Sequence, residues 1–179
     1  MRNRGPDFQD YREHRHGDTF IYLLHSRLSI IDLDARSHQP FTIDDCTIIY
    51  NGEIYNYVEL RKDLEKRGVA FKTTSDTEVL LQYYLNYGES CVDYFEGMWS
   101  FVIYDRTKKT LFLSRDRFAE KPLYYSKADD GFYFGSEIKF IAALSGHSLT
   151  ANVSHLLRYL VNGYKSLYKT EETFFEEIH

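Results

Sequence analysis

The chain has 179 residues, which is enough for one domain with a sizeable hydrophobic core. Its formal net charge of −5 gives no electrostatic reason to expect a nucleic acid or an anionic membrane as partner. No apolar run approaches the roughly 18 residues of a membrane-spanning helix, and the N-terminus has no apolar signal core. We therefore expect a cytoplasmic protein that does not bind membranes.

The few cysteines and the scattered histidines limit the possible metal sites and reactive thiols. Cys46 and Cys91 are the only cysteines and do not make a metal-ligand set. We expect both thiols to be reduced, as is usual in the cytosol. His14 and His16 are the only close histidine pair, and they lie in the polar stretch 9–18, which we interpret as a solvated loop. No metal site is expected.

Short strands are predicted in the first third of the chain. The runs 19–24 and 28–31 are apolar or β-branched and too short for buried helices. The polar stretch 34–40 predicts a loop. A further strand is predicted at 46–50, and Asn51-Gly52 is expected to end it.

Two helices are predicted next. Asn56 can cap the first, and Gly68 can end it. Ser75 and Glu78 have the spacing of a capping box, in which each side chain satisfies an open backbone amide. Apolar residues at helical spacing follow, and Gly88 is expected to end this second helix.

The remaining pattern is dominated by hairpins. Residues 98–104 with 110–114 predict one hairpin, and 123–125 with 132–134 predict another. A short helix is expected to begin near 136–139, and 153–162 predicts a last one. Hairpins with inserted helices favour an α+β fold of mainly antiparallel sheets covered by helices over a parallel sheet.

A few polar residues could carry chemistry. Asn51-Gly52 is a strong turn signal, but a helix pattern follows it, and an Asn amide beside a Gly N–H can also stabilise an oxyanion. Arg27 can simply reach solvent or can bind a substrate carboxylate. Asp76 can stabilise a helix start or accept from a substrate ammonium group. Taken singly, each residue leaves both interpretations open.

The order of the motifs is more informative than any one of them. Taken in that order, they resemble the glutaminase domain of glutamine-dependent asparagine synthetases, which are class II glutamine amidotransferases. The matching stretches are Arg4-Gly5-Pro6-Asp7, Arg27-Leu28-Ser29-Ile30-Ile31-Asp32, Gln39-Pro40-Phe41, Tyr50-Asn51-Gly52-Glu53-Ile54-Tyr55-Asn56, Ser75-Asp76-Thr77-Glu78, Gly97-Met98-Trp99-Ser100-Phe101, Arg115-Asp116-Arg117-Phe118-Ala119-Glu120-Lys121-Pro122-Leu123-Tyr124-Tyr125 and Ser136-Glu137-Ile138-Lys139.

This resemblance implies a fold and a domain organisation. The family has the N-terminal-nucleophile hydrolase architecture, an αββα sandwich of two mainly antiparallel sheets between helical layers. Residues 1–150 would form the amidotransferase domain without its N-terminal strand and nucleophile. Residues 151–179 would begin the linker to an ATP-dependent synthetase domain that is absent from this sequence.

The resemblance also implies a glutamine site. Arg27 would bind the α-carboxylate, and the backbone of Leu28, Ser29, Ile30 and Ile31 would line the pocket. Glu53 and Asp76 would receive the α-ammonium group. The Asn51 side chain and the Gly52 N–H would form the oxyanion hole. No cofactor or metal is expected in this domain, whereas ATP and magnesium are expected in the synthetase domain.

The implied function is glutamine hydrolysis that supplies ammonia for ATP-dependent asparagine synthesis from aspartate. The implied partners are L-glutamine and a synthetase domain in cis, and the parent protein could form a homodimer. Two alternatives stay open. The ammonia could serve another carboxylate, as in surface-polysaccharide or peptide biosynthesis, or the chain could be a non-catalytic glutamine-binding or scaffold module.

The sequence departs from the family at the nucleophile, a cysteine at the mature N-terminus. Neither Cys46 nor Cys91 has the free amine of that residue, so we expect the chain as printed to be inactive alone. It would be a fragment, a domain that has lost hydrolysis, or a domain completed by a separate chain.

A second departure is Ala119, where the family usually has Gly. If this position needs a positive φ, Ala strains the backbone by about 1 kcal/mol. Ala119 lies in the charged run 115–121, which could be a solvated turn or a local ion-pair lattice.

Overall fold

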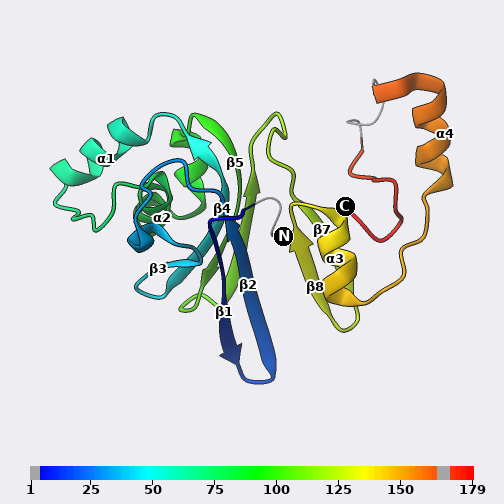
Figure 1. Cartoon of the computed structure of the whole chain (residues 1–179), viewed down its shortest axis with the longest axis horizontal. Helices are drawn as coiled ribbons and strands as arrows, with labels where there is room; N and C mark the ends of the chain where they lie inside the picture. The colour runs from blue at the N-terminus through cyan, green and yellow to red at the C-terminus, as the bar shows by residue number, and fades with distance from the viewer. Residues whose placement is uncertain (1–4, 165–169) are drawn as a thin grey trace. The chain divides into compact units, whose positions relative to one another are not determined.

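The computed structural model describes residues 5–164 and 170–179. The chain divides into two compact units, Met1–Lys121 and Pro122–His179 (Figure 1). The division reflects compactness, and the domain boundary expected after residue 150 stays a prediction. In the described parts, no helix is long and apolar enough to cross a membrane.

A four-stranded antiparallel sheet forms the centre of the first unit. Its strands lie in the order β3, β4, β5 and β6, so the predicted hairpin of β5 and β6 is confirmed. Side chains alternate between its faces. Ile48, Tyr50 and Ile54 of β4 and Phe101 of β5 share one buried face. The strands are β3 (Phe41–Ile43), β4 (Cys46–Ile54), β5 (Gly97–Asp105) and β6 (Thr110–Arg115).

Two helices cover this face, as predicted. α1 (Tyr57–Lys66) contributes Leu60 and Leu64, which lie one turn apart, and α2 (Asp76–Tyr87) contributes Leu80 among its buried residues. The 3-10 helix η2 (Gly88–Tyr94) follows α2, and Cys91 in it is fully buried. The helices and the sheet share one hydrophobic core, which holds β4 in place.

A separate hairpin, β1 (Phe8–His16) and β2 (Thr19–Arg27), packs on the opposite face of the sheet. Leu23 is fully buried, and the rings of His14 and Tyr104 lie 4.9 Å apart. The interpretation of 9–18 as a loop was wrong, because cross-strand pairing orders a polar strand that has little hydrophobic alternation. Residues 28–31, expected to be extended, form no strand.

β4 does not end at Asn51-Gly52, which corrects the expected boundary. The strand continues to Ile54, and Gly52 lies opposite Trp99 of β5. A Cβ atom on Gly52 would lie 2.2 Å from the Met98 carbonyl oxygen. Glycine is therefore used here for close strand approach, and the turn signal misled the prediction.

The capping box at α2 is only half present. Ser75 Oγ accepts from the Thr77 N–H at 3.0 Å, as expected. The Glu78 carboxylate instead accepts from the N–H groups of Lys72 and Thr73, at 2.9 and 2.6 Å. Glu78 therefore fixes the segment before the helix, a contact that the local pattern does not encode.

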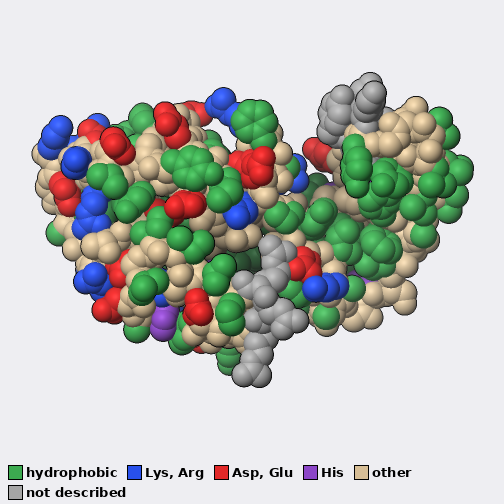
Figure 2. Space-filling model, turned by 45° about the horizontal axis from the view of Figure 1, so that its top comes forward, with side chains coloured by type: hydrophobic (Ala, Val, Ile, Leu, Met, Phe, Trp, Pro, Cys, Tyr) green, Lys and Arg blue, Asp and Glu red, His purple; other side chains and the backbone are tan. Residues whose placement is uncertain are grey.

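The second unit contains the predicted second hairpin and two helices. β7 (Tyr124–Ala128) and β8 (Gly131–Gly135) pack against α3 (Ile138–Ser145), whose Ile141 is buried. α4 (Val153–Asn162) has the predicted bounds and ends before Gly163, as predicted, and the Asn152 side chain caps its start. Figure 2 shows hydrophobic side chains gathered over α4, where Leu160 and Val161 are 76% and 80% exposed.

Candidate functional site

The direction of the Gly52 backbone follows from hydrogen bonds on the neighbouring strand. Trp99 lies opposite Gly52, but its N–H and C=O both bond to Asp116, which follows β6, at 3.3 and 2.8 Å. Backbone groups of facing residues alternate between bonding each other and pointing away. Gly52 therefore directs its N–H and C=O away from β5, toward the edge of β4 that β3 leaves uncovered beyond Ile48.

Side chains occupy this uncovered edge on both sides of Gly52. The Tyr50 N–H donates to Gln39 Oε1 at 2.6 Å, and the Tyr50 C=O accepts from His25 Nε2 at 3.0 Å. The Ile54 N–H donates to Asp76 Oδ2 at 3.1 Å. Among the described residues, no side chain accepts from the Gly52 N–H.

Asp76 is a buried carboxylate beside this edge. It is 5% exposed and also accepts from the Tyr50 hydroxyl at 2.9 Å. Burial raises the pKa of Asp76, the hydrogen bonds from Ile54 and Tyr50 oppose that shift, and the nearby charge of Glu53 adds to it. Two neighbouring carboxylates that repel each other are suited to bind a cation between them.

Arg27 is buried at the end of β2 and contacts the loop that follows it. Its guanidinium donates to the Asp34 and Ile31 carbonyl oxygens, at 3.2 and 3.3 Å, and to that of Asp32. Because a guanidinium has five N–H donors, these three bonds leave donors for a carboxylate.

The loop 28–31 has its own anchors. The Ser29 N–H donates to Asp7 Oδ2, and the Thr74 N–H donates to Asp32 Oδ2, both at 2.7 Å. The second contact ties the loop to the segment just before α2. Of the predicted lining residues, Leu28 and Ile30 are exposed, whereas Ser29 and Ile31 are half-buried.

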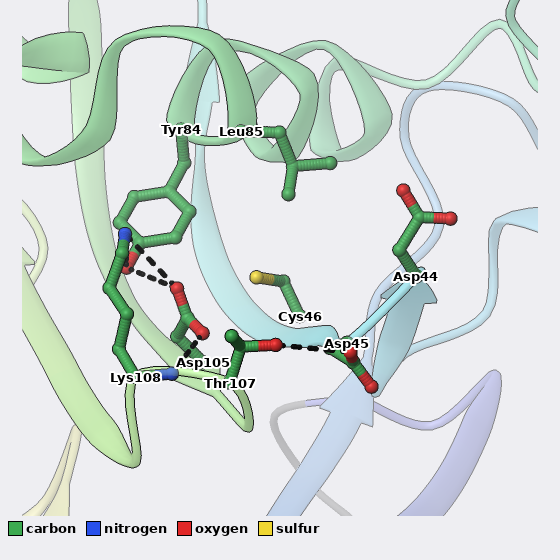
Figure 3. A pocket seen from close by; sticks show the side chains of 8 residues that line it. All are labelled: Asp44, Asp45, Cys46, Tyr84, Leu85, Asp105, Thr107 and Lys108. Atoms are coloured by element: carbon green, nitrogen blue, oxygen red, sulfur yellow. Dashed lines mark hydrogen bonds and ion pairs between the residues drawn. The ribbon is translucent and has the colours of Figure 1, made fainter.

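A pocket of about 270 Å³ lies elsewhere, at the start of β4, and Cys46 lines it (Figure 3). Lys108 and Tyr84 both bond to Asp105 there. Burial raises the pKa of the Cys46 thiol to about 12, and that of Cys91 likewise. Neither thiol has the thiolate character of a nucleophile. The described residues contain no group of three or more His, Cys, Asp or Glu side chains that could hold a metal.

The model of one protein family, described as a glutamine amidotransferase domain, matches residues 1–179. The chain belongs to this family. The amidotransferase domain is 42% identical over 147 residues to asparagine synthetase [glutamine-hydrolyzing] 3 of Bacillus subtilis, covering 80% of this chain and 23% of that protein. It is 37% identical over 171 residues to the Zea mays asparagine synthetase [glutamine-hydrolyzing], covering 94% of this chain and 28% of that protein.

The amidotransferase domain thus spans about a quarter of the length of these relatives. Among solved structures, it is similar to the glutamine phosphoribosylpyrophosphate amidotransferase of B. subtilis, with a TM-score of 0.59 and 22% identity over 73% of this chain and 30% of that one. This likeness in fold agrees with the predicted α+β architecture of mainly antiparallel sheets and helices.

The structure places the predicted residues of the amidotransferase domain on neighbouring segments of the first unit. Asn51, Gly52 and Glu53 lie on β4, Asp76 begins α2, and Arg27 ends β2, which contacts β4 through His25. Three contributors were missed as site residues. Tyr50 and Gln39 lie in matching stretches and could have been found there, whereas His25 has only its spacing from Arg27 as a signal.

Proposed function

We propose that this chain binds L-glutamine and presents the side-chain amide for hydrolysis. The observation that carries the proposal is the Gly52 N–H, which points to the uncovered edge of β4 beside the buried Asp76 carboxylate. An N–H fixed in a strand is a preorganised donor for the oxyanion that forms when an amide is attacked. The Asn51 side chain would supply the second donor.

The α-groups of glutamine give the other residues their roles. A zwitterionic amino acid needs a cation for its carboxylate and one or two anions for its ammonium group. Arg27 would bind the carboxylate through its remaining donors, with Leu28, Ser29, Ile30 and Ile31 around it, and Glu53 with Asp76 would bind the ammonium. Fixing both α-groups orients the amide toward Gly52.

In the parent protein, we propose that the released ammonia serves ATP-dependent synthesis of asparagine from aspartate. The names of the relatives support this activity. A synthetase domain in cis would bind ATP and magnesium, and the domain described here would need neither. We propose a cytoplasmic location and a homodimeric parent.

A second candidate is glutamine binding without hydrolysis. The burial of both Cys46 and Cys91 favours it for the chain as printed, because neither thiol can serve as nucleophile. Such a module would use the same contacts to glutamine.

The test compares the printed chain with a version extended upstream to a Cys-first terminus. Glutamine binding is measured by calorimetry and ammonia release by a coupled assay. Binding in both forms with ammonia release only in the extended form is expected. Binding without release in both would support the second candidate.

The Arg27→Ala variant tests the carboxylate role, and Arg117→Ala, an exposed arginine outside the site, is its control. A charge-assisted pair contributes about 1.5–3 kcal/mol, so Arg27→Ala should weaken glutamine binding by about tenfold to a hundredfold. Unchanged affinity in Arg27→Ala would show that the carboxylate binds elsewhere.

A further inference from the structure

His25 connects the β1–β2 hairpin to the part of β4 that carries the site. Among the described residues, no strand pairs with the outer edge of β4 beyond Ile48. His25 Nε2 lies 3.0 Å from the Tyr50 carbonyl oxygen, two residues before Gly52 on the same edge. With Gln39 on the Tyr50 N–H, both backbone groups of Tyr50 are taken by side chains. The next residue that directs its backbone to this edge is Gly52.

The chemistry of the contact fixes the state of the imidazole. A carbonyl oxygen can only accept, so His25 Nε2 carries the proton, and in the neutral ring Nδ1 is an acceptor. Nδ1 is buried and has no hydrogen-bond partner in the part of the chain that the structure describes. Burial lowers the pKa of His25 to about 4, so the ring is neutral near pH 7. The unpaired Nδ1 acceptor costs folding free energy because it is buried. The hydrogen bond from Nε2–H to the Tyr50 carbonyl oxygen is the favourable contact of this ring that opposes the cost.

The two ends of the proposed glutamine site depend on different contacts. Two hydrogen bonds hold the loop after Arg27. The Asp7 carboxylate accepts from the Ser29 N–H, and the Asp32 carboxylate accepts from the Thr74 N–H. The Gly52 end is held by the pairing of β4 with β5 and, on the outer edge of β4, by side-chain contacts to the backbone of Tyr50 and Ile54. Loss of the His25 contact should therefore disturb the amide end of the site more than the α-carboxylate end.

We propose that His25 is a positioning residue that steadies the Gly52 N–H, whose direction follows from the pairing of β4 with β5, by holding the Tyr50 carbonyl oxygen, so that the site distinguishes a side-chain amide from an alkyl group. This inference rests on the proposed function, because it assumes that glutamine binds at Gly52. His25 touches no reacting atom in this scheme and acts through β4.

The experiment measures the affinities of L-glutamine and L-norvaline by calorimetry. L-norvaline has the α-carboxylate and α-ammonium groups but no amide. His25→Met removes the N–H donor at similar size, and His25→Gln can restore a donor. His14→Ala, which removes another half-buried imidazole of the hairpin, is the control for lost packing. Thermal unfolding of each variant shows that it is folded, and His25→Phe replaces His25→Met if the latter does not fold.

We expect His25→Met to weaken glutamine binding by about tenfold, the size of one lost hydrogen bond, and norvaline binding by less than about twofold. His25→Gln should recover most of the preference, and His14→Ala should keep it. Equal losses in His25→Met and His14→Ala, or an unchanged preference in His25→Met, would overturn the inference while the proposed function stands. If the parent chain does not prefer glutamine to norvaline, the proposed function fails and the inference fails with it.

Discussion

At the scale of single residues, the site contains titratable side chains whose charged form is disfavoured by burial. Asp76 is the clearest of these, since its carboxylate is almost fully buried and is bonded to Tyr50 and Ile54. When folding raises the pKa of a group, the group adds to the folding stability below its pKa in the unfolded chain. This contribution is lost as the pH rises through the pKa of the folded protein. At neutral pH the charged Asp76 therefore costs stability that ligand binding can offset.

Asp76→Asn should separate stability from binding. The amide keeps an acceptor for Tyr50 and Ile54 but has no charge, so we expect a higher midpoint of thermal unfolding at pH 7. Glutamine affinity should fall by about tenfold or more, because the ammonium group loses a charged partner. Calorimetry and thermal unfolding check both effects. A stabilised variant with full affinity would exclude Asp76 from the ammonium site.

His25 predicts a pH dependence of stability. Its pKa falls from 6.5 to about 4 on folding because burial disfavours the charged ring. The unfolded chain therefore binds a proton on His25 at a higher pH than the folded chain does. Folding stability is lost as the pH falls from about 6.5 to about 4. The loss relative to His25→Gln should reach about 3 kcal/mol. Urea unfolding of both proteins at several pH values measures it, and parallel pH profiles would contradict it.

Ala119 has the strained backbone that its sequence position suggested. Its φ is 55°, in the region that favours glycine. Ala119→Gly should raise the free energy of unfolding by about 0.5–1 kcal/mol after the entropy cost of glycine in the unfolded chain. Ala143→Gly in α3 is the control and should lower it by about 1 kcal/mol. Chemical denaturation gives both values, and destabilisation by Ala119→Gly would be the contrary outcome.

At the scale of elements, the register of β4 against β5 sets up the site. Gly52 allows close approach, and Asp116 holds Trp99 from the other side. Asp116 is buried, and although burial alone would raise the pKa of this carboxyl, backbone N–H donors including Lys121, Glu120 and Trp99 lower it. The charged run 115–121 is therefore neither a fully solvated turn nor, among the described residues, an ion-pair lattice.

Gly52→Ala should disrupt this register. The added Cβ would lie 2.2 Å from the Met98 oxygen and 2.8 Å from Trp99 Cα, so the strands must separate. We expect a loss of about 3 kcal/mol in unfolding free energy together with loss of glutamine binding. Gly135→Ala is the control, since its Cβ would meet only ordinary contacts of 3.7 Å or more. Urea denaturation measures the unfolding free energy of both variants. Equally small losses in Gly52→Ala and Gly135→Ala would show that β4 and β5 can separate at little cost, against this prediction.

At the scale of the whole molecule, each unit has its own buried centre. Both cysteines belong to the first unit, where Cys46 is 3% exposed and Cys91 is fully buried. Reaction of either thiol therefore requires that the structure around it opens.

Both thiols should be unreactive in the native protein. Burial raises the pKa of each to about 12, so little thiolate forms at pH 8. An Ellman reagent should label neither cysteine in the folded chain and both in guanidinium chloride. Fast labelling of one cysteine in the native state would reveal local opening or a thiolate-stabilising environment.

Most of the helices and strands, and the family, follow from short segments of the sequence. The core helices and both predicted hairpins follow from local periodicity. The Ser75 cap of α2 is present, whereas the Asn56 side chain makes no cap hydrogen bond at α1. The ordered motifs around Arg27, Asn51-Gly52 and Asp76 identified the family. These signals are contained in short windows, so no knowledge of distant contacts was needed. The roles of those residues toward glutamine stay predictions.

The arrangement of the site depends instead on contacts between distant parts of the chain. The continuation of β4 through Gly52, the polar strand β1 and the contacts of His25 and Glu78 all depend on pairing between distant segments. A local pattern reports which residues share a face, but it does not report strand register or which backbone groups are left unpaired. The Gly52 N–H became a candidate donor only when its neighbours on both sides were seen to be occupied.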